Sequence, residues 1–301
     1  MAPPPQFCHN PIMPMLWEFL LEVERPQLVT RAGLHWLCST WLDRPADSAE
    51  SRTRSPSAPG HKDNSKPWSL RWIEPHNRGL LIQVGIMDDT PLSRSALSDS
   101  TRGLSEDLHD GILRSLKRAL PDARMSLGNA GAFRTRAYVR NREEAPIHCV
   151  STESWGELLN SPPIDSWRID FRTTTSFRSG GRYIATPRPR LVTKSLRARW
   201  AADGPPLPID PLRESRSFQL ETNELNIRPS VERSSHGDIP GFIGSVEYRI
   251  EQRVKEHPVD DADRRCLGAL LRLAKYAGIG VETRKGMGVA KVFALQPAKA
   301  F

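Results

Sequence analysis

Four glycines near the end of the chain constrain its fold more than any other feature. They are Gly278, Gly280, Gly286 and Gly288, two Gly-apolar-Gly steps separated by five residues that include Arg284 and Lys285. Glycine adopts positive φ without strain and lets the backbone approach a neighbour closely. Apolar residues recur at helical spacing over 264–277, and the apolar run 289–295 is typical of a strand. This glycine loop (278–288) therefore predicts a tight helix-to-strand connection, unlike nucleotide-binding loops in which the strand comes first.

The overall charge favours a polyanionic partner. The chain of 301 residues has a net charge of +8 and a pI near 9.6, which favours binding to nucleic acid. No apolar run approaches the ~18 residues of a membrane span, so no membrane partner is expected. The four cysteines form no CxxC pair and no zinc ligand set. We therefore expect reduced thiols, a cytoplasmic location and no metal or other cofactor.

The first half of the chain has the periodicity of alternating strands and helices. Six segments follow the order βαββαβ: 15–24, 28–44, 68–73, 79–87, 105–120 and 123–138. The stretch 45–66 between the first helix and the second strand is polar, and we expect a mobile loop there. This order of elements predicts a ferredoxin-like unit.

The second half repeats this order in a looser form. Its expected strands and helices are 166–177, 190–202, 218–231, 242–251, 260–277 and 289–295. The predicted fold class is α+β, with two tandem ferredoxin-like (RRM-like) domains. The expected divisions are an extended N-terminal segment 1–14, a first domain 15–145 and a second domain 146–301 that carries the glycine loop.

Placed between a helix and a strand, the glycine loop resembles that of the CRISPR-associated RAMP superfamily. More narrowly, it is similar to the repeat-RNA endoribonucleases, the Cas-six family. Softer similarities lie in the threonine-rich segment 167–177, in the Gly-Phe-x-Gly segment 241–244 and in the segment 61–70. The same resemblance implies two tandem ferredoxin-like domains.

The resemblance also implies an activity. The expected protein is a metal-independent endoribonuclease that binds a repeat hairpin in CRISPR precursor RNA and cuts it to give mature guide RNA. Attack by the 2′-hydroxyl would give a 2′,3′-cyclic phosphate and a 5′-hydroxyl. The alternative is a non-catalytic RAMP protein that holds guide RNA. In either case the expected partners are repeat RNA, mature guide RNA and other subunits of a CRISPR effector complex.

RNA cleavage of this kind needs a base near the 2′-hydroxyl, an acid near the 5′-oxygen and positive charge near the phosphorane. Histidine suits both proton roles. The resemblance implies a site on or just after the first helix of the first domain, where His35 and His61 lie. These two histidines are the catalytic candidates, and Lys66 is the candidate for stabilising the phosphorane. Arg31 and Ser39 are four residues either side of His35, so all three share one helix face.

RNA binding is predicted for a second basic region. The segment 166–200 contains nine Arg or Lys residues against a single acid, Asp170, with aromatic residues interspersed. Such a region suits contacts to the backbone and loops of RNA. The candidate contacts are Arg172, Arg178, Arg182, Arg188, Arg190, Lys194 and Arg197, together with the four loop glycines, Arg284 and Lys285. The alternatives are a solvated helix face for the segment and a purely structural turn for the loop.

Overall fold

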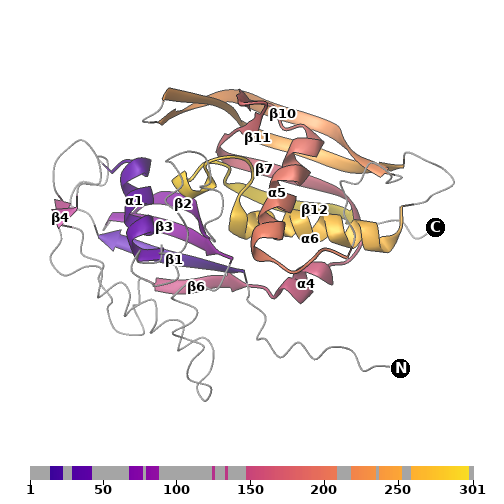
Figure 1. Cartoon of the computed structure of the whole chain (residues 1–301), viewed down its shortest axis with the longest axis horizontal. Helices are drawn as coiled ribbons and strands as arrows, with labels where there is room; N and C mark the ends of the chain where they lie inside the picture. Colours follow the sequence, from indigo (N-terminus) through magenta and orange to yellow (C-terminus); the bar gives the residue numbers. More distant parts are fainter. Residues whose placement is uncertain are drawn as a thin grey trace, which may run out of the picture.

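Two four-stranded antiparallel sheets, two short two-stranded sheets and their helices make up the described part of the chain (Figure 1). This computed structural model describes residues 14–22, 29–42, 68–76, 79–87, 124–125, 133–134, 147–208, 218–234, 237–252 and 259–297. Within those residues, no helix has the length and apolar character needed to cross a membrane.

The first sheet has the strand order of a ferredoxin-like unit. Its elements are β1 (Met15–Glu22), α1 (Arg31–Leu42), β2 (Trp68–His76), β3 (Gly79–Ile86) and β6 (Ile147–Thr152). The strands lie in the order β2-β3-β1-β6, and all neighbours are antiparallel. The helix that the sequence predicts at 105–120 lies outside the described residues.

The fourth strand of this sheet is not where the sequence predicts it. Within 123–138, β4 (Arg124–Met125) and β5 (Phe133–Arg134) pair only with each other. The fourth strand is β6, which pairs with β1, so the first unit extends to Thr152 and the expected boundary at 145 is wrong. β6 is a six-residue edge strand, too short to give a clear alternation of apolar and polar residues.

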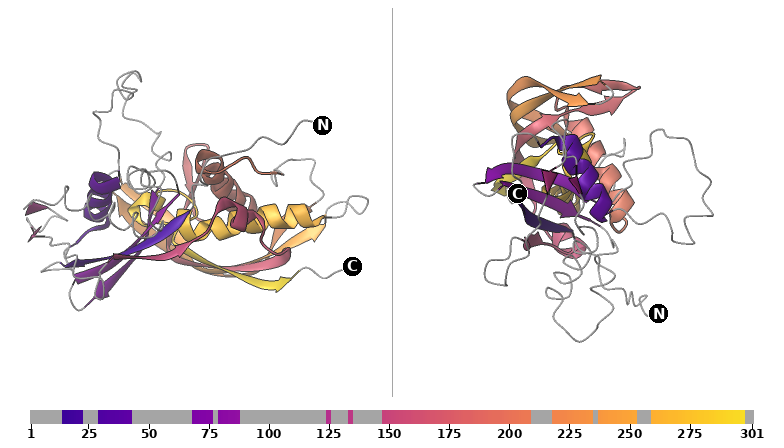
Figure 2. Two further views of the ribbon diagram at one scale, coloured as in Figure 1. Left: turned by 90° about the horizontal axis from the view of Figure 1, so that it is seen from below. Right: turned by 90° about the vertical axis from the view of Figure 1, so that its left-hand side faces the viewer.

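The second sheet repeats the same topology. Its elements are α4 (Trp155–Leu159), β7 (Ile164–Thr175), β8 (Phe177–Ser179), β9 (Arg182–Ile184), α5 (Pro189–Asp203), β10 (Phe218–Ser234), β11 (Gly237–Gln252), α6 (Asp261–Ala277), the 3₁₀ helix η4 (Thr283–Lys285) and β12 (Ala290–Pro297). The strand order is β10-β11-β7-β12, and α5 and α6 cover one face of the sheet (Figure 2). The predicted α+β class with two tandem ferredoxin-like units is confirmed.

Helix α6 leads directly into the glycine loop. Asp260 caps its start by accepting a hydrogen bond from Asp263 N at 2.7 Å, and acidic residues in the first turn complement the helix dipole. Leu267, Leu270 and Ala274 lie on the face of α6 that packs on the sheet, and each is at most 1% exposed. The helix therefore holds the start of the loop firmly against the core.

The first domain packs against the end of this helix. On β2, Ser69 Oγ donates to Tyr276 O, and Arg71 donates from Nε to Lys275 O at 2.9 Å and from Nη2 to Ala290 O at 3.1 Å. The last carbonyls of a helix have no partner within the helix, and a cation near them complements the negative end of the dipole. Side chains of one domain therefore cap a helix of the other.

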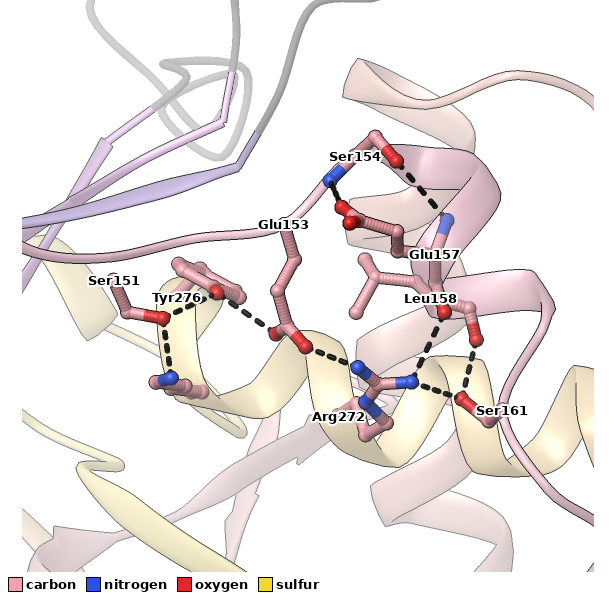
Figure 3. A network of polar contacts seen from close by, with 9 residues as sticks. Ser151, Glu153, Ser154, Glu157, Leu158, Ser161, Arg272 and Tyr276 are labelled. Atoms are coloured by element: carbon pink, nitrogen blue, oxygen red, sulfur yellow. Dashed lines mark hydrogen bonds and ion pairs between the residues drawn. The ribbon is translucent and has the colours of Figure 1, made fainter. Parts of the chain in front are cut away.

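A polar network joins the connection between the two domains to α6 (Figure 3). Tyr276 Oη donates to Glu153 Oε2 at 2.8 Å and lies 3.1 Å from Ser151 Oγ, while Arg272 forms an ion pair with Glu153. Burial raises the pKa of the Tyr276 phenol, so it keeps the proton that it donates. The network sets how β6 of the first domain lies on the second.

Candidate functional site

The conformation of the glycine loop requires its glycines. Their φ angles are +74° for Gly278, +96° for Gly280, +80° for Gly286 and +65° for Gly288. Space is equally restrictive, because a Cβ atom on Gly280 would lie 2.3 Å from Ser176 O and one on Gly288 would lie 1.9 Å from Ile279 O. The positive φ angle at each of the four positions therefore disfavours any residue other than glycine. At Gly280 and Gly288 a side chain would also clash with a backbone oxygen.

Most amides of the loop already donate within the protein. Those with protein acceptors are the N–H groups of Gly278, Ile279, Gly280, Val281, Lys285, Gly286, Met287 and Gly288. Gly280 N, for example, donates to Ser195 Oγ of α5 at 2.8 Å, and Gly288 N donates to Thr174 O of β7 at 3.0 Å. These amides are therefore not open to a phosphate, and they tie the loop to α5 and to the neighbouring strands. RNA binding by the loop glycines stays a prediction.

Two glycine variants separate backbone strain from steric clash. Gly181→Ala places a Cβ in open space at φ +79°, so we expect a loss of about 1 kcal/mol in the free energy of unfolding. Gly288→Ala has similar strain and also meets Ile279 O, so its loss should be clearly larger. Chemical denaturation of both variants measures the difference. Equal losses would show that the close contact at Gly288 relaxes without cost.

Helix α1 lies beside the glycine loop. Arg31 Nη1, at the start of the helix, donates to Gly286 O at 3.3 Å and to Glu232 Oε2 of β10 at 3.0 Å. Thr30 caps the helix by accepting from Gly33 N at 3.1 Å. The first helix, the loop and the long β10–β11 hairpin therefore meet at Arg31.

Of the three catalytic candidates, the structure describes only His35. His35 follows Arg31 by one helical turn, is half-buried, and its ring centroid lies 5.7 Å from that of Trp68 on β2. Trp68 is fully buried, so it holds the imidazole from the core side. His61 and Lys66 lie outside the described residues, and their proposed roles stay predictions.

Of the two basic residues in the loop, Lys285 is partly exposed and Arg284 is buried. Lys285 Nζ lies 3.0 Å from Glu282 Oε2, and both side chains are about one-third exposed. Arg284 is only 6% exposed. Burial lowers the pKa of Arg199 on α5; the negative charge of Asp203 opposes this shift, and the positive charge of Arg284 adds to it. Two arginines and one aspartate therefore interact between α5 and the loop, which the sequence did not reveal.

The other predicted RNA contacts fall on two faces of the second domain. On β8, β9, α5 and the turn that joins them, the exposed cations are Arg178, Arg182, Arg188, Arg190, Lys194 and Arg197. Arg172 does not join them. On β7 the buried Ile169 and Phe171 face the helices, so Arg172 points to the other side of the sheet, where it pairs with Asp170 at 3.1 Å. The cations of the basic segment 166–200 are therefore divided between two faces of the second domain.

Arg172 instead lines a cleft of about 690 Å³ between the two domains. Other cations in its wall come from both halves of the chain: Arg71, Arg272, Lys275 and Lys291. Sequence analysis did not single out these four residues, because they are far apart along the chain and none belongs to a dense basic run.

Comparisons with known proteins point to one family. Residues 169–290 match the family model for CRISPR-associated endoribonuclease Cas6. The CRISPR-associated endoribonuclease Cas6 of Mycobacterium tuberculosis is 25% identical over 242 residues, 75% of this chain and 73% of the relative. That of Streptococcus thermophilus is 26% identical over 156 residues, 50% of this chain and 60% of the relative.

Solved structures agree with the sequence relatives. A product complex of a Thermus thermophilus Cas6 is 28% identical, with a TM-score of 0.64 over 94% of this chain and 100% of the other. A second Cas6 product complex, 22% identical with a TM-score of 0.62 over 93% of this chain and 99% of the other, supports the fold alone. The resemblance carried by the glycine loop is thereby confirmed: this chain is similar in sequence and in fold to the CRISPR-associated endoribonucleases named Cas6.

Proposed function

We propose that this chain is a metal-independent endoribonuclease that binds a hairpin in CRISPR repeat RNA and cuts within the repeat to give mature guide RNA. The observation that carries the proposal is the meeting of α1 and the glycine loop at Arg31, with His35 one turn further along the same helix face. The relatives named as endoribonucleases and the Cas6 product complexes support RNA processing as the general activity.

The reaction needs few protein groups, because RNA supplies its own nucleophile. His35 would move a proton at the 2′-hydroxyl or at the departing 5′-oxygen, where an imidazole is effective near neutral pH. The Arg31 guanidinium, about one-third exposed on the same helix face, would stabilise charge on the phosphorane. His61 and Lys66 remain proposed second members of the site. The products would be a 2′,3′-cyclic phosphate and a 5′-hydroxyl.

The exposed cations of β8, β9 and α5 would hold the RNA hairpin. This surface has six Arg or Lys side chains directed to solvent, and such charges bind phosphates in a sequence-independent and salt-dependent manner. Lys285 lies in the loop beside α1 and would extend the surface toward the cut site. Mature guide RNA and other effector subunits are proposed as later partners.

A single substitution in the RNA tests the reaction type. Repeat RNA with a 2′-deoxy nucleotide at the cut position should bind as well as the all-ribose RNA but stay uncut, since the nucleophile is missing. The all-ribose RNA should be cut at the same rate in excess EDTA and in Mg²⁺. Loss of cleavage in EDTA would contradict the metal-independent mechanism. Tight binding without cleavage under all conditions would favour the alternative, a guide-RNA-binding subunit that does not cut.

A further inference from the structure

A cavity lies between α5 and the glycine loop, separate from Arg31 and His35. Its volume is about 220 Å³, and its wall comes from β8, α5 and the loop. Typical ligand pockets measure ~300–1,000 Å³. A cavity of this size is too small for a base-paired stem or a run of nucleotides, and it suits a single nucleotide unit.

The charged side chains in the wall of this cavity are all positive. Arg178, Lys194 and Arg199 line it, and among the residues that the structure describes no carboxylate does. The Arg199 side chain is only 10% exposed, and its Nη1 lies 3.9 Å from Asp203 Oδ2. The buried Arg284 adds a second positive charge nearby. A cation as poorly solvated as Arg199 attracts an anion strongly.

Polar and apolar groups are arranged around these cations. Arg199 Nη2 lies 3.3 Å from Thr283 Oγ1, which orients the guanidinium along the loop. Ser195 Oγ accepts from Gly280 N at 2.8 Å, and a hydroxyl that accepts one hydrogen bond can still donate its own proton. Leu191 and Val281 supply apolar wall. Phosphate and base of a nucleotide need these two kinds of surface.

We propose that this cavity takes one unpaired nucleotide of the bound RNA, with its phosphate at Lys194 and Arg199 and its base against Leu191 and Val281. The inference rests on the proposed function only in taking RNA as the source of the nucleotide. It gives the glycine loop a second role, because the loop forms one side of the cavity through Gly280, Val281 and Thr283. Arg199, which belongs to the basic segment 166–200 of the sequence, is thereby proposed to bind the phosphate of this nucleotide.

Three variants test the cavity. Arg199→Gln removes the buried charge but keeps an amide donor, and Ala198→Leu fills the cavity from an exposed helix position without changing charge. Arg265→Gln is the control, because it removes one charge from an exposed position of α6, outside the cavity wall and outside the proposed RNA-binding surface. Affinity for the repeat RNA should fall about tenfold or more in Arg199→Gln and Ala198→Leu, as for loss of a charge-assisted contact. It should stay close to the parental value in Arg265→Gln.

A second measurement keeps this test independent of cleavage. NMR titration of the RNA-free protein with nucleoside 5′-monophosphates should shift signals around the cavity in the parent and in Arg265→Gln, but not in Arg199→Gln or Ala198→Leu. The nucleosides and inorganic phosphate serve as single-component probes and should bind more weakly. The proposal is overturned if all three variants bind RNA equally well, or if the monophosphates leave the cavity signals unchanged. Either result would leave the cleavage assay in EDTA, and hence the proposed function, unaffected.

Discussion

His35→Ala is expected to slow single-turnover cleavage of repeat RNA by about 10²–10⁴-fold, the usual contribution of a general acid or base. The affinity for RNA should change little, because His35 is half-buried on α1 and the exposed cations lie on α5 and the β8–β9 hairpin. Rapid-quench measurement with enzyme in excess separates the rate of cleavage from binding. Ser39→Ala, one turn along the same face, is the control and should cut at close to the parental rate.

A purely structural role for His35 would give another pattern. Its ring is 5.7 Å from that of Trp68, so the alanine variant leaves a space that a free imidazole molecule can enter. Imidazole added to the solution should therefore restore part of the cleavage rate of His35→Ala and should not affect the parent. A parental rate in His35→Ala would contradict the assignment, and His61 and Lys66 would then be the next residues to test.

Arg71→Ala is expected to produce the largest loss of stability among single changes at the junction of the domains. Arg71 is 3% exposed and donates to Lys275 O and Ala290 O. Each buried carbonyl left without a donor costs about 1–3 kcal/mol, so the free energy of unfolding should fall by about 2–6 kcal/mol. The cleavage rate should fall as well, since β2 positions Trp68 and the first domain against the glycine loop.

The control for Arg71→Ala is an arginine at an exposed position. Arg249→Ala removes the same side chain from an exposed position on β11, and its free energy of unfolding should stay within about 0.5 kcal/mol of the parent. Thermal and urea unfolding of both variants give the comparison. If Arg71→Ala is as stable and as active as Arg249→Ala, the guanidinium does not hold the domains together.

The second half of the chain could be predicted well because its patterns are long. The helix expected at 260–277 is Asp261–Ala277, and the strand expected at 166–177 is Ile164–Thr175. The fourth strand of the first sheet was missed, because the six residues of β6 give too few alternations to separate a strand from a connection. Short edge strands depend on tertiary pairing more than on their own pattern.

Side-chain placement could be predicted only in part. The alternation of Ile169 and Phe171 on β7 already indicates that Arg172 faces away from the helices. The burial of Arg284 and its proximity to Arg199 could not be foreseen, because they depend on how α5 packs on the glycine loop across about 85 residues of sequence. The loop amides donate hydrogen bonds in this same packing. Four glycines with a basic pair therefore indicated a binding loop, but the sequence did not show which groups accept from its N–H groups.

The chemical identity of the product ends tests the central claim most directly. Repeat RNA is cut by the purified protein in EDTA, and the fragments are analysed by mass spectrometry. A 2′,3′-cyclic phosphate on the upstream fragment and a 5′-hydroxyl on the downstream fragment are predicted, since the 2′-hydroxyl is the nucleophile. A 3′-hydroxyl with a 5′-phosphate would show that water is the nucleophile, and would contradict the account of α1 and the glycine loop as a metal-independent RNA-cleaving site.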